Sequence, residues 1–412
     1  MDGAKRAYKT HSGFYTLIYC LSIGIAATGV NTLPNPPSLN PTNWDTEDTL
    51  WIAAYGWDRD RSHDAYPLNY SSNQQTSGWA AANGAAIAAA TYNLNAASED
   101  PGKATIGASD GWIAQTVAIR PAQPITISGT LYSDEGTTAI TSSKTIKIAV
   151  GTTTTGVYST STDTNGDWTY TFAPGHEIGY GINVLVWVDG DAVDANTFTV
   201  AFDPYDLSGL NLYEDRVIIR DEGTTGVTLA DLAFYDSTDD TDIQYTASST
   251  LDSLEILNAQ ELHIWNDSTF VNAASSTLNG SLHNDGGVFA QNSGVMILAG
   301  TSETISGSTT ATSTLGDISI SGTYTMSDNS STTDLSILSG GALTAPSILT
   351  IGGDYTNNGT FTHNSGLTYI DSDTKIQTIS GTLTGTSAFN DLELLGETKK
   401  TFGSSASTSD FT

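Results

Sequence analysis

The chain has 412 residues, of which only 14% are charged, and its formal net charge at pH 7 is −31. This length leaves room for about two or three domains and a sizeable core. Such acidity excludes nucleic acid and anionic membrane surfaces as general partners. Cys20 is the single cysteine, so no intramolecular disulfide can form and stability must come from packing.

Residues 1–29 are open to two interpretations. Basic residues precede an apolar run over residues 14–27 that ends in small residues, which is the order of a secretory signal peptide. Alternatively, residues 14–29 form a strand of the following domain. The apolar run is too short, and too interrupted by Ser, Thr and Gly, to predict a membrane span, so no membrane insertion is expected beyond that signal peptide.

Residues 30–121 begin with a proline-rich stretch, NTLPNPPSLNP, which predicts an extended start to this module. The Ala-rich run over residues 80–90 has helix propensity. It lies between turn-rich segments, however, and is predicted to be a strand. The stretches PNPPSL, DTLWIAAYGWD, AAIAAATYNLNAASEDPG and GWIAQTVAIRP resemble a jelly-roll-type module of phage and bacterial surface proteins. The resemblance implies a jelly-roll-like β-sandwich with the Ala-rich run as a strand, and it implies no chemistry.

Residues 122–203 contain short alternating segments separated by turns every eight to twelve residues or so, which is the spacing of an all-β sandwich. The segment TDTNGDWTYTF is similar to the Asn-Gly hairpin of bacterial Ig-like surface repeats. The resemblance implies an Ig-like β-sandwich for this part of the chain.

Residues 204–412 contain internal repeats. Gly287 and Phe289 recur as Gly359 and Phe361 at an offset of 72 (361 − 289), and the offset becomes 74 further on (381 − 307). LEILNAQEL also resembles LSILSGGAL at an offset of 81 (335 − 254). Apolar residues alternate with Ser, Thr or Asn and the runs end at Gly or Asn, a pattern of short strands and turns. Each repeat therefore predicts about three coils of a right-handed parallel β-helix, or β-solenoid.

The end of the chain bears on its completeness. Its last residues, STSDF, resemble STTDL at residues 331–335, which in the first copy lies before further strands. Solenoids usually end in a polar cap. We therefore expect the solenoid to be truncated and the sequence to be a fragment of a longer protein.

An enzyme is one alternative, because solenoids of this type include pectate-lyase-like proteins. Such a lyase needs calcium-binding carboxylates and a basic residue that abstracts a proton, yet no Lys or Arg occurs between Arg220 and Lys375. A hydrolase needs two carboxylates about 5–9.5 Å apart. Asp371 and Asp373 are the candidates, but the first copy has neutral residues at the equivalent positions. We predict no catalytic residues and no enzymatic activity.

Two acidic clusters are candidate calcium sites. Neither has the spacing of an EF-hand loop, and solvated acidic turns are the alternative interpretation. No cofactor other than calcium is predicted. The first cluster, which is the candidate metal site, comprises Asp236, Asp239, Asp240 and Asp242, and the second comprises Asp189, Asp191 and Asp194.

Aromatic residues are concentrated in residues 30–121. Aromatic rings stack on sugars, and jelly rolls often bind carbohydrate. Trp57 and Trp79 are therefore the candidate ligand-binding residues, for an extracellular polysaccharide or a host or cell-surface glycan. The alternative is that these rings fill the core of the sandwich.

Together these features predict an all-β, multi-module protein that is extracellular or located at the cell surface. The expected role is structural or adhesive: a stiff β-solenoid stalk that carries a jelly-roll-like and an Ig-like sandwich. The first alternative is a phage tail or virion fibre protein, although the heptads that would form a trimer are not visible. The second alternative is a polysaccharide lyase or hydrolase of the β-helix class.

Overall fold

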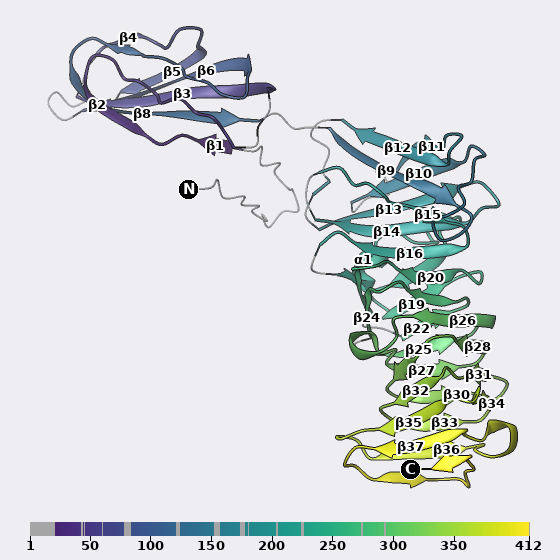
Figure 1. Ribbon diagram of the computed structural model, residues 1–412. Helices are drawn as coiled ribbons and strands as arrows, with labels where there is room; N and C mark the ends of the chain where they lie inside the picture. The colour runs from purple at the N-terminus through teal and green to yellow at the C-terminus, as the bar shows by residue number, and fades with distance from the viewer. Residues whose placement is uncertain are drawn as a thin grey trace. The chain divides into compact units, whose positions relative to one another are not determined.

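The computed structural model shows an all-β chain. Residues 1–124 with 173–176 form one compact unit, and residues 125–172 with 177–412 form a second (Figure 1). No helix among the described residues is long and apolar enough to cross a membrane. The structure describes residues 21–411 with gaps at 43, 45, 60, 78–83, 121–123, 152–156, 174–177, 180, 203–204, 224–225, 273–274 and 292–293.

The first unit contains a six-stranded antiparallel sheet. In its strand β3 (Asp48–Asp58) buried and more exposed residues alternate, with Trp51, Ala53, Tyr55 and Trp57 buried on one face. Loops and a small two-stranded sheet, β4 (His63–Ala65) with β7 (Thr105–Ile106), cover that face. In order across the sheet the strands are β1 (Leu21–Ile23), β8 (Asp110–Ile119), β3 (Asp48–Asp58), β6 (Ala85–Asn95) and β5 (Ser71–Ser77), and β2 (Ala27–Asn31) also pairs with β8.

Two sequence predictions fall on this sheet. The Ala-rich run is a strand over residues 85–95, and residues 80–83 lie outside the described residues. Its alternate alanines are buried against Tyr55 and Trp112, because small side chains leave room for large rings across the core. Of the segment with two interpretations, residues 21–23 and 27–31 pair with β8, and residues 1–20 lie outside the described residues.

The second unit begins with two facing β-layers. Ile127 and Trp168 of one layer pack with Ile146 and Val186 of the other in a shared core. One layer is β12 (Asp167–Phe172), β9 (Ile125–Tyr132) and β15 (Leu212–Tyr213), and the other is β11 (Val157–Ser161), β10 (Thr145–Val150), β13 (Ile182–Asp189) and β14 (Ala195–Ala201).

One eleven-stranded sheet, here called the long sheet, joins this region to the solenoid. Strands from β11 to β14 are antiparallel, and β16 (Arg216–Asp221) then adds to β14 in parallel. Trp187 and Phe198 lie in the same hydrophobic core as Val217 and the coils below. Residues on both sides of position 203, where the sequence analysis divides two modules, therefore share a sheet and a core. After β16 the sheet continues through β20 (Glu261–Ile264), β23 (Leu282–Asn284), β26 (Thr301–Gly307), β28 (Thr323–Met326), β31 (Ala342–Thr344) and β34 (Thr360–Thr362).

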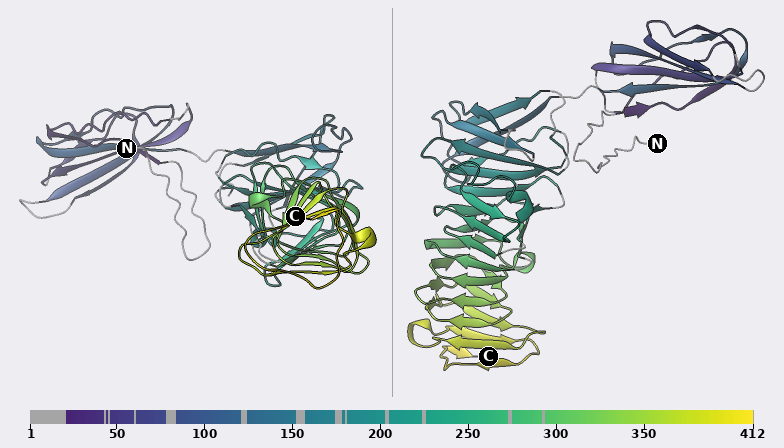
Figure 2. Two further views of the ribbon diagram at one scale, coloured as in Figure 1. Left: turned by 60° about the horizontal axis from the view of Figure 1, so that its bottom comes forward. Right: turned by 180° about the vertical axis from the view of Figure 1, so that it is seen from behind.

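The remaining chain is a right-handed-type β-solenoid of about 10 turns with three faces (Figure 2). The long sheet is its first face. The second is a nine-stranded sheet of β18 (Tyr245–Ser248), β19 (Ser253–Ile256), β22 (Ser275–Leu278), β25 (Val295–Leu298), β27 (Asp317–Ile320), β30 (Leu335–Ile337), β33 (Tyr355–Asn357), β36 (Gln377–Gly381) and β38 (Lys400–Phe402). The third consists of β17 (Val227–Thr228), β21 (Thr269–Asn272) and β24 (Val288–Gln291), and further down of β29 (Ser330–Thr332), β32 (Ile348–Ile351), β35 (Leu367–Asp371), β37 (Asp391–Leu395) and β39 (Asp410–Phe411).

The two sequence offsets have different structural meanings. The offset of 81 carries β19 onto β30 and β20 onto β31, which lie in the same sheets four coils later. The offset of 72 to 74 instead carries β24 of the third face onto β34 of the long sheet. It likewise carries β25 onto β35 and β26 onto β36, again in different sheets. This repeat spans three coils and two further faces, rather than the three coils that the sequence analysis predicts.

The repeated residues keep their local contacts although they change face. The backbone N–H of Phe289 donates to Ser313 Oγ at 3.2 Å, and that of Phe361 donates to Ser387 Oγ at 3.1 Å. Each serine ends a short 3₁₀ turn, η1 (Ala311–Ser313) or η2 (Gly385–Ser387). The repeat therefore keeps the hydrogen bond between the phenylalanine backbone and the serine of the 3₁₀ turn, although the equivalent strands lie in different sheets.

Candidate functional site

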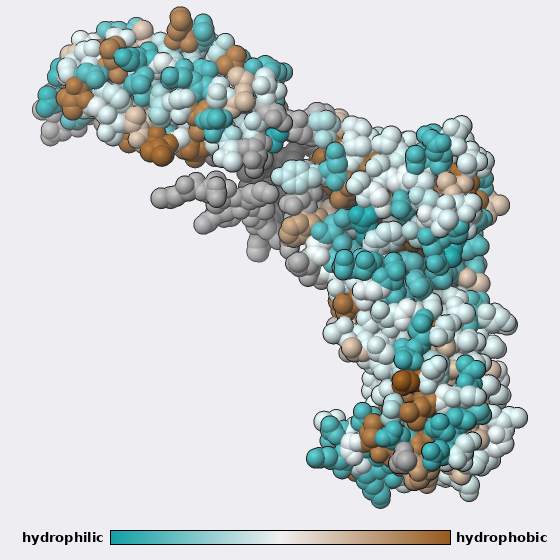
Figure 3. Space-filling model, viewed as in Figure 1, coloured by the Kyte–Doolittle hydropathy of each residue, from teal (hydrophilic) through white to brown (hydrophobic). Residues whose placement is uncertain are grey.

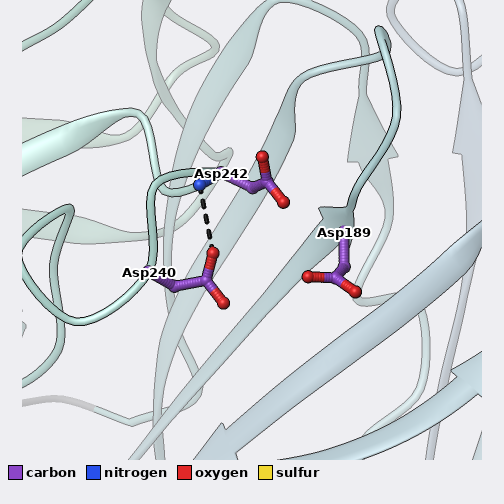
Figure 4. A group of neighbouring side chains, drawn as sticks. All are labelled: Asp189, Asp240 and Asp242. Carbon is purple, nitrogen blue, oxygen red and sulfur yellow. Dashed lines mark hydrogen bonds between the residues drawn. The ribbon is translucent and has the colours of Figure 1, made fainter.

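The acidic residues predicted as metal ligands come together in a different grouping. Asp189 ends β13, and the loop between α1 (Leu229–Leu232) and β18 brings Asp240 and Asp242 to it. One carboxylate oxygen from each of the three lies within 4.8 Å of the others (Figure 4). The group thus takes one member from one predicted cluster and two from the other.

A buried asparagine holds this arrangement. Asn196 of β14 is fully buried, and its side-chain oxygen accepts the N–H of Gln244 at 2.7 Å. Its Nδ2 donates to the backbone oxygen of Asp242 at 3.1 Å. The loop is fastened again where the N–H of Gly190 donates to Asp242 Oδ2 at 2.7 Å. The loop and the β13–β14 turn are therefore held in one geometry.

A lysine pairs with two of the three carboxylates. Lys147 of β10 places its Nζ 2.9 Å from Asp189 Oδ1 and 3.7 Å from Asp240 Oδ2. The hydrogen bond to Asp189 raises the pKa of the Lys147 ammonium above its ordinary value. Its single positive charge offsets part of the negative charge of the three carboxylates.

The other residues of the two predicted clusters have structural partners. Asp236 is 5% exposed, and its carboxylate accepts the N–H of Thr238 and the N–H of Ala247, both at 2.8 Å. Asp239 Oδ2 accepts the N–H of Asp236 at 3.1 Å. These contacts close the turn of the loop, which is what a hydrogen-bonded Asx-type turn does.

Asp191 and Asp194 also lie apart from the group of three. Asp191 pairs with Lys144 Nζ at 2.7 Å, and Asp194 Oδ1 accepts from Gln244 Nε2 at 3.0 Å. Burial, together with repulsion from Asp215 and Asp242, raises the pKa of the Asp194 carboxyl. Several carboxylates therefore lie close enough together in this region to repel one another.

Replacing Lys147 with methionine is expected to make this site responsive to calcium. Without the ammonium the three carboxylates repel one another, so we expect a loss of about 1 kcal/mol in the free energy of unfolding. Millimolar calcium should restore the melting temperature of this variant while leaving that of the wild type unchanged, as measured by circular dichroism. Lys144→Met, which removes the partner of Asp191 alone, is the matched control and should show no calcium response. An equal calcium response in the wild type and in Lys147→Met would contradict this account.

Trp57 and Trp79 are the residues predicted to bind sugar. Trp57 is 3% exposed, packs beside Tyr55 and Trp112 in the core, and donates its indole N–H to the backbone oxygen of Arg61 at 3.2 Å. Stacking on a sugar requires an exposed ring face, and Trp57 offers none. Trp79 lies outside the described residues.

The carboxylates considered for hydrolysis lie at the end of β35. Asp373 Oδ1 accepts the N–H of Glu397 at 3.1 Å. The nearest lysine in the sequence, Lys375, places its Nζ 2.7 Å from Asp334 and 3.3 Å from Asp354, so it pairs with carboxylates of other coils. These contacts join neighbouring coils of the solenoid.

Neither the role of Lys147 nor the meeting of Asp189 with Asp240 and Asp242 was predicted from the sequence. No local signal indicates either contact, because roughly fifty residues separate Asp189 from Asp240 and Asp242. Comparisons with protein-family models, with curated proteins and with solved structures give no match for this chain.

Proposed function

We propose that this chain is a non-enzymatic surface protein, extracellular or at the cell surface, in which a β-solenoid stalk carries β-sandwich modules. The observation that supports this most is the long sheet, which passes from antiparallel strands into stacked parallel coils over one core. Stacked sheets with a shared core resist bending at that junction. Such a stalk suits a structural or adhesive role.

The two modules are proposed to be sandwiches of known types. The facing layers of residues 125–201, with their core around Ile127 and Trp168, support an Ig-like module. The antiparallel sheet of β3, β6 and β8 supports a jelly-roll-like module for residues 30–121. In this proposal the modules contact an extracellular polysaccharide or a cell-surface glycan, and the coils position them.

A low proportion of charged residues favours tight stacking of the coils, which supports the proposed stalk. The outward threonines Thr304, Thr325, Thr344 and Thr362 lie in register on four successive strands of the long sheet. Charged residues stacked in the same way would repel one another at the strand spacing of about 4.8 Å. The net charge of −31 is instead spread over the whole chain, where it limits non-specific association.

The test is a binding and turnover assay on the full chain. The protein is applied to an array of polysaccharides with and without calcium, and released reducing ends and unsaturated products are followed at the same time. Retention on a glycan without product is the expected result, and heat-denatured protein is the control. Release of reducing ends or unsaturated sugars would overturn the non-enzymatic proposal.

A further inference from the structure

The solenoid brings together two histidines that lie 20 residues apart in the sequence (283 − 263). His263 of β20 and His283 of β23 are partners in the parallel register of the long sheet. Leu262 and Ile264, on either side of His263, lie in the solenoid core, so the His263 ring is on the outward side of the sheet. The centroids of the two imidazole rings are 5.0 Å apart. One coil of the solenoid therefore stacks one imidazole beside another.

One nitrogen of each ring is held by a hydrogen bond. His263 Nδ1 lies 3.3 Å from Glu261 Oε1, and His283 Nδ1 lies 2.8 Å from Ser306 Oγ. An ionised carboxylate only accepts hydrogen bonds, so a neutral His263 carries its proton on Nδ1 and has a free lone pair on Nε2. Histidines that bind metals usually donate their other N–H to a carboxylate, a carbonyl or water. His263 therefore has the tautomer that a metal ligand requires.

Glu261 is held in its ionised form. Arg216 Nε lies 3.1 Å from Glu261 Oε1, the same oxygen that His263 contacts. Burial alone would raise the pKa of the Glu261 carboxyl, but the hydrogen bond with His263 and the charge of Arg216 outweigh it, and the pKa is lowered. Arg216 is itself held by Glu135, whose Oε1 lies 3.1 Å from its Nη2. This network fixes the orientation of the His263 ring.

The other nitrogen of His263 is buried and has no hydrogen-bond partner. The side chain is 3% exposed, and no described residue donates to or accepts from its Nε2. The rings of Tyr213 and Trp265 enclose it, with centroids 5.7 Å and 6.1 Å from that of His263. Native proteins seldom leave a buried polar atom unpaired, and a bound ion is one way in which such an atom is satisfied. The unpaired Nε2 is therefore an observation that points to a ligand.

The donor atoms favour a transition metal over calcium. Neutral imidazole nitrogens bind Zn²⁺, Ni²⁺ and Cu²⁺, whereas Ca²⁺ takes oxygen ligands. The group of Asp189, Asp240 and Asp242 offers oxygen alone. The surroundings favour a cation, because the chain carries a net charge of −31. Hydrophilic residues also gather on the visible face of the second unit, at the level of β14 and β16 (Figure 3).

We propose that His263 and His283 form a site for a divalent transition-metal ion, which each ring binds through its Nε2. A shared ion requires the two Nε2 atoms to lie within about 4.2 Å of each other, which is twice the Zn–N distance. Ring centroids 5.0 Å apart are compatible with this after a small rotation of the half-buried His283 ring. Two protein ligands leave the other coordination positions to water. This inference goes beyond the proposed function and does not depend on it.

Isothermal titration calorimetry of the untagged full chain with Zn²⁺ tests the proposal. We expect one ion to bind per chain at neutral pH, and binding to be lost below about pH 5.5 as the imidazoles become protonated. His263→Gln and His283→Gln should each weaken binding at least about tenfold, since losing even an outer partner of a ligand costs that much. Their losses should not add in the double variant, because both act on one ion. His363→Gln removes a histidine outside this pair and should leave the affinity unchanged.

Electron paramagnetic resonance of the chain loaded with Cu²⁺ gives a second readout. Two coordinated imidazole nitrogens should be visible in the wild type, and one in either single variant. A wild type that binds no Zn²⁺ up to millimolar concentration overturns the proposal, and a water molecule then satisfies Nε2. Binding that persists in both His263→Gln and His283→Gln, with folding verified by circular dichroism, also overturns it. Binding that is instead lost in Asp240→Asn assigns the ion to the acidic group.

Discussion

Replacing Gly307 with alanine is expected to lower the free energy of unfolding by about 3 kcal/mol or more. Gly307 has a φ of +80°, a region that L-residues rarely adopt. A Cβ at this position would also lie far inside van der Waals distance of the backbone oxygen of Asn284 on the preceding coil. The two coils can accommodate it only by separating, which breaks the stacking on both sides.

Gly385→Ala is the matched control for this variant. Gly385 also has a positive φ, +65°, but a Cβ there would meet nothing within 4 Å. Replacing it should lower the free energy of unfolding by only about 1 kcal/mol, which is the cost of holding an L-residue at positive φ. Urea unfolding followed by circular dichroism measures both. Equal losses in the two variants would show that coil stacking at Gly307 is not tight.

Truncating Phe361 to alanine is expected to destabilise the solenoid by about 3–5 kcal/mol, because it opens a cavity in the core. The ring is fully buried, with centroids 5.9 Å from Tyr355 and 5.7 Å from Phe389. Tyr355, Phe361 and Phe389 contact one another in the core, so truncating Phe361 removes its contacts with both of the other rings.

The neighbouring Thr362→Ala is the control for Phe361→Ala. Thr362 points outward and is exposed, so its substitution should change the free energy of unfolding by no more than about 0.5 kcal/mol. The urea midpoint of each variant is compared with that of the wild type. A Phe361→Ala midpoint close to that of Thr362→Ala would mean that the core around Tyr355 repacks without a cavity.

Local periodicity made the all-β class and the solenoid predictable. Alternation in segments such as DISI, over β27, reports directly which side chains face the core. The same alternation in β3 places Trp51, Tyr55 and Trp57 on one face, which is a signal that Trp57 belongs to the core. Features carried by side-chain period were therefore accessible from the sequence.

Features that depend on pairing between distant strands were not accessible. The parallel addition of β16 to β14 joins two segments that differ in sequence character, and only the structure reveals their shared sheet. The displacement of the repeat by two faces could be predicted only if the length of each coil were known, and this length varies along the chain. The meeting of Asp189 with Asp240 and Asp242 depends on Asn196 holding a loop about fifty residues away.

Hydrogen–deuterium exchange of the full chain tests most directly whether the antiparallel layers and the solenoid of the second unit form one continuous folded body. The measurement compares the amides of β14 and β16, where antiparallel pairing gives way to parallel pairing, with those of β28 and β31 deep in the solenoid. Because one sheet and one core cross the junction, we predict similarly slow exchange at all four strands. Fast exchange confined to β14 and β16 would show that the junction opens independently, and it would contradict a single continuous body.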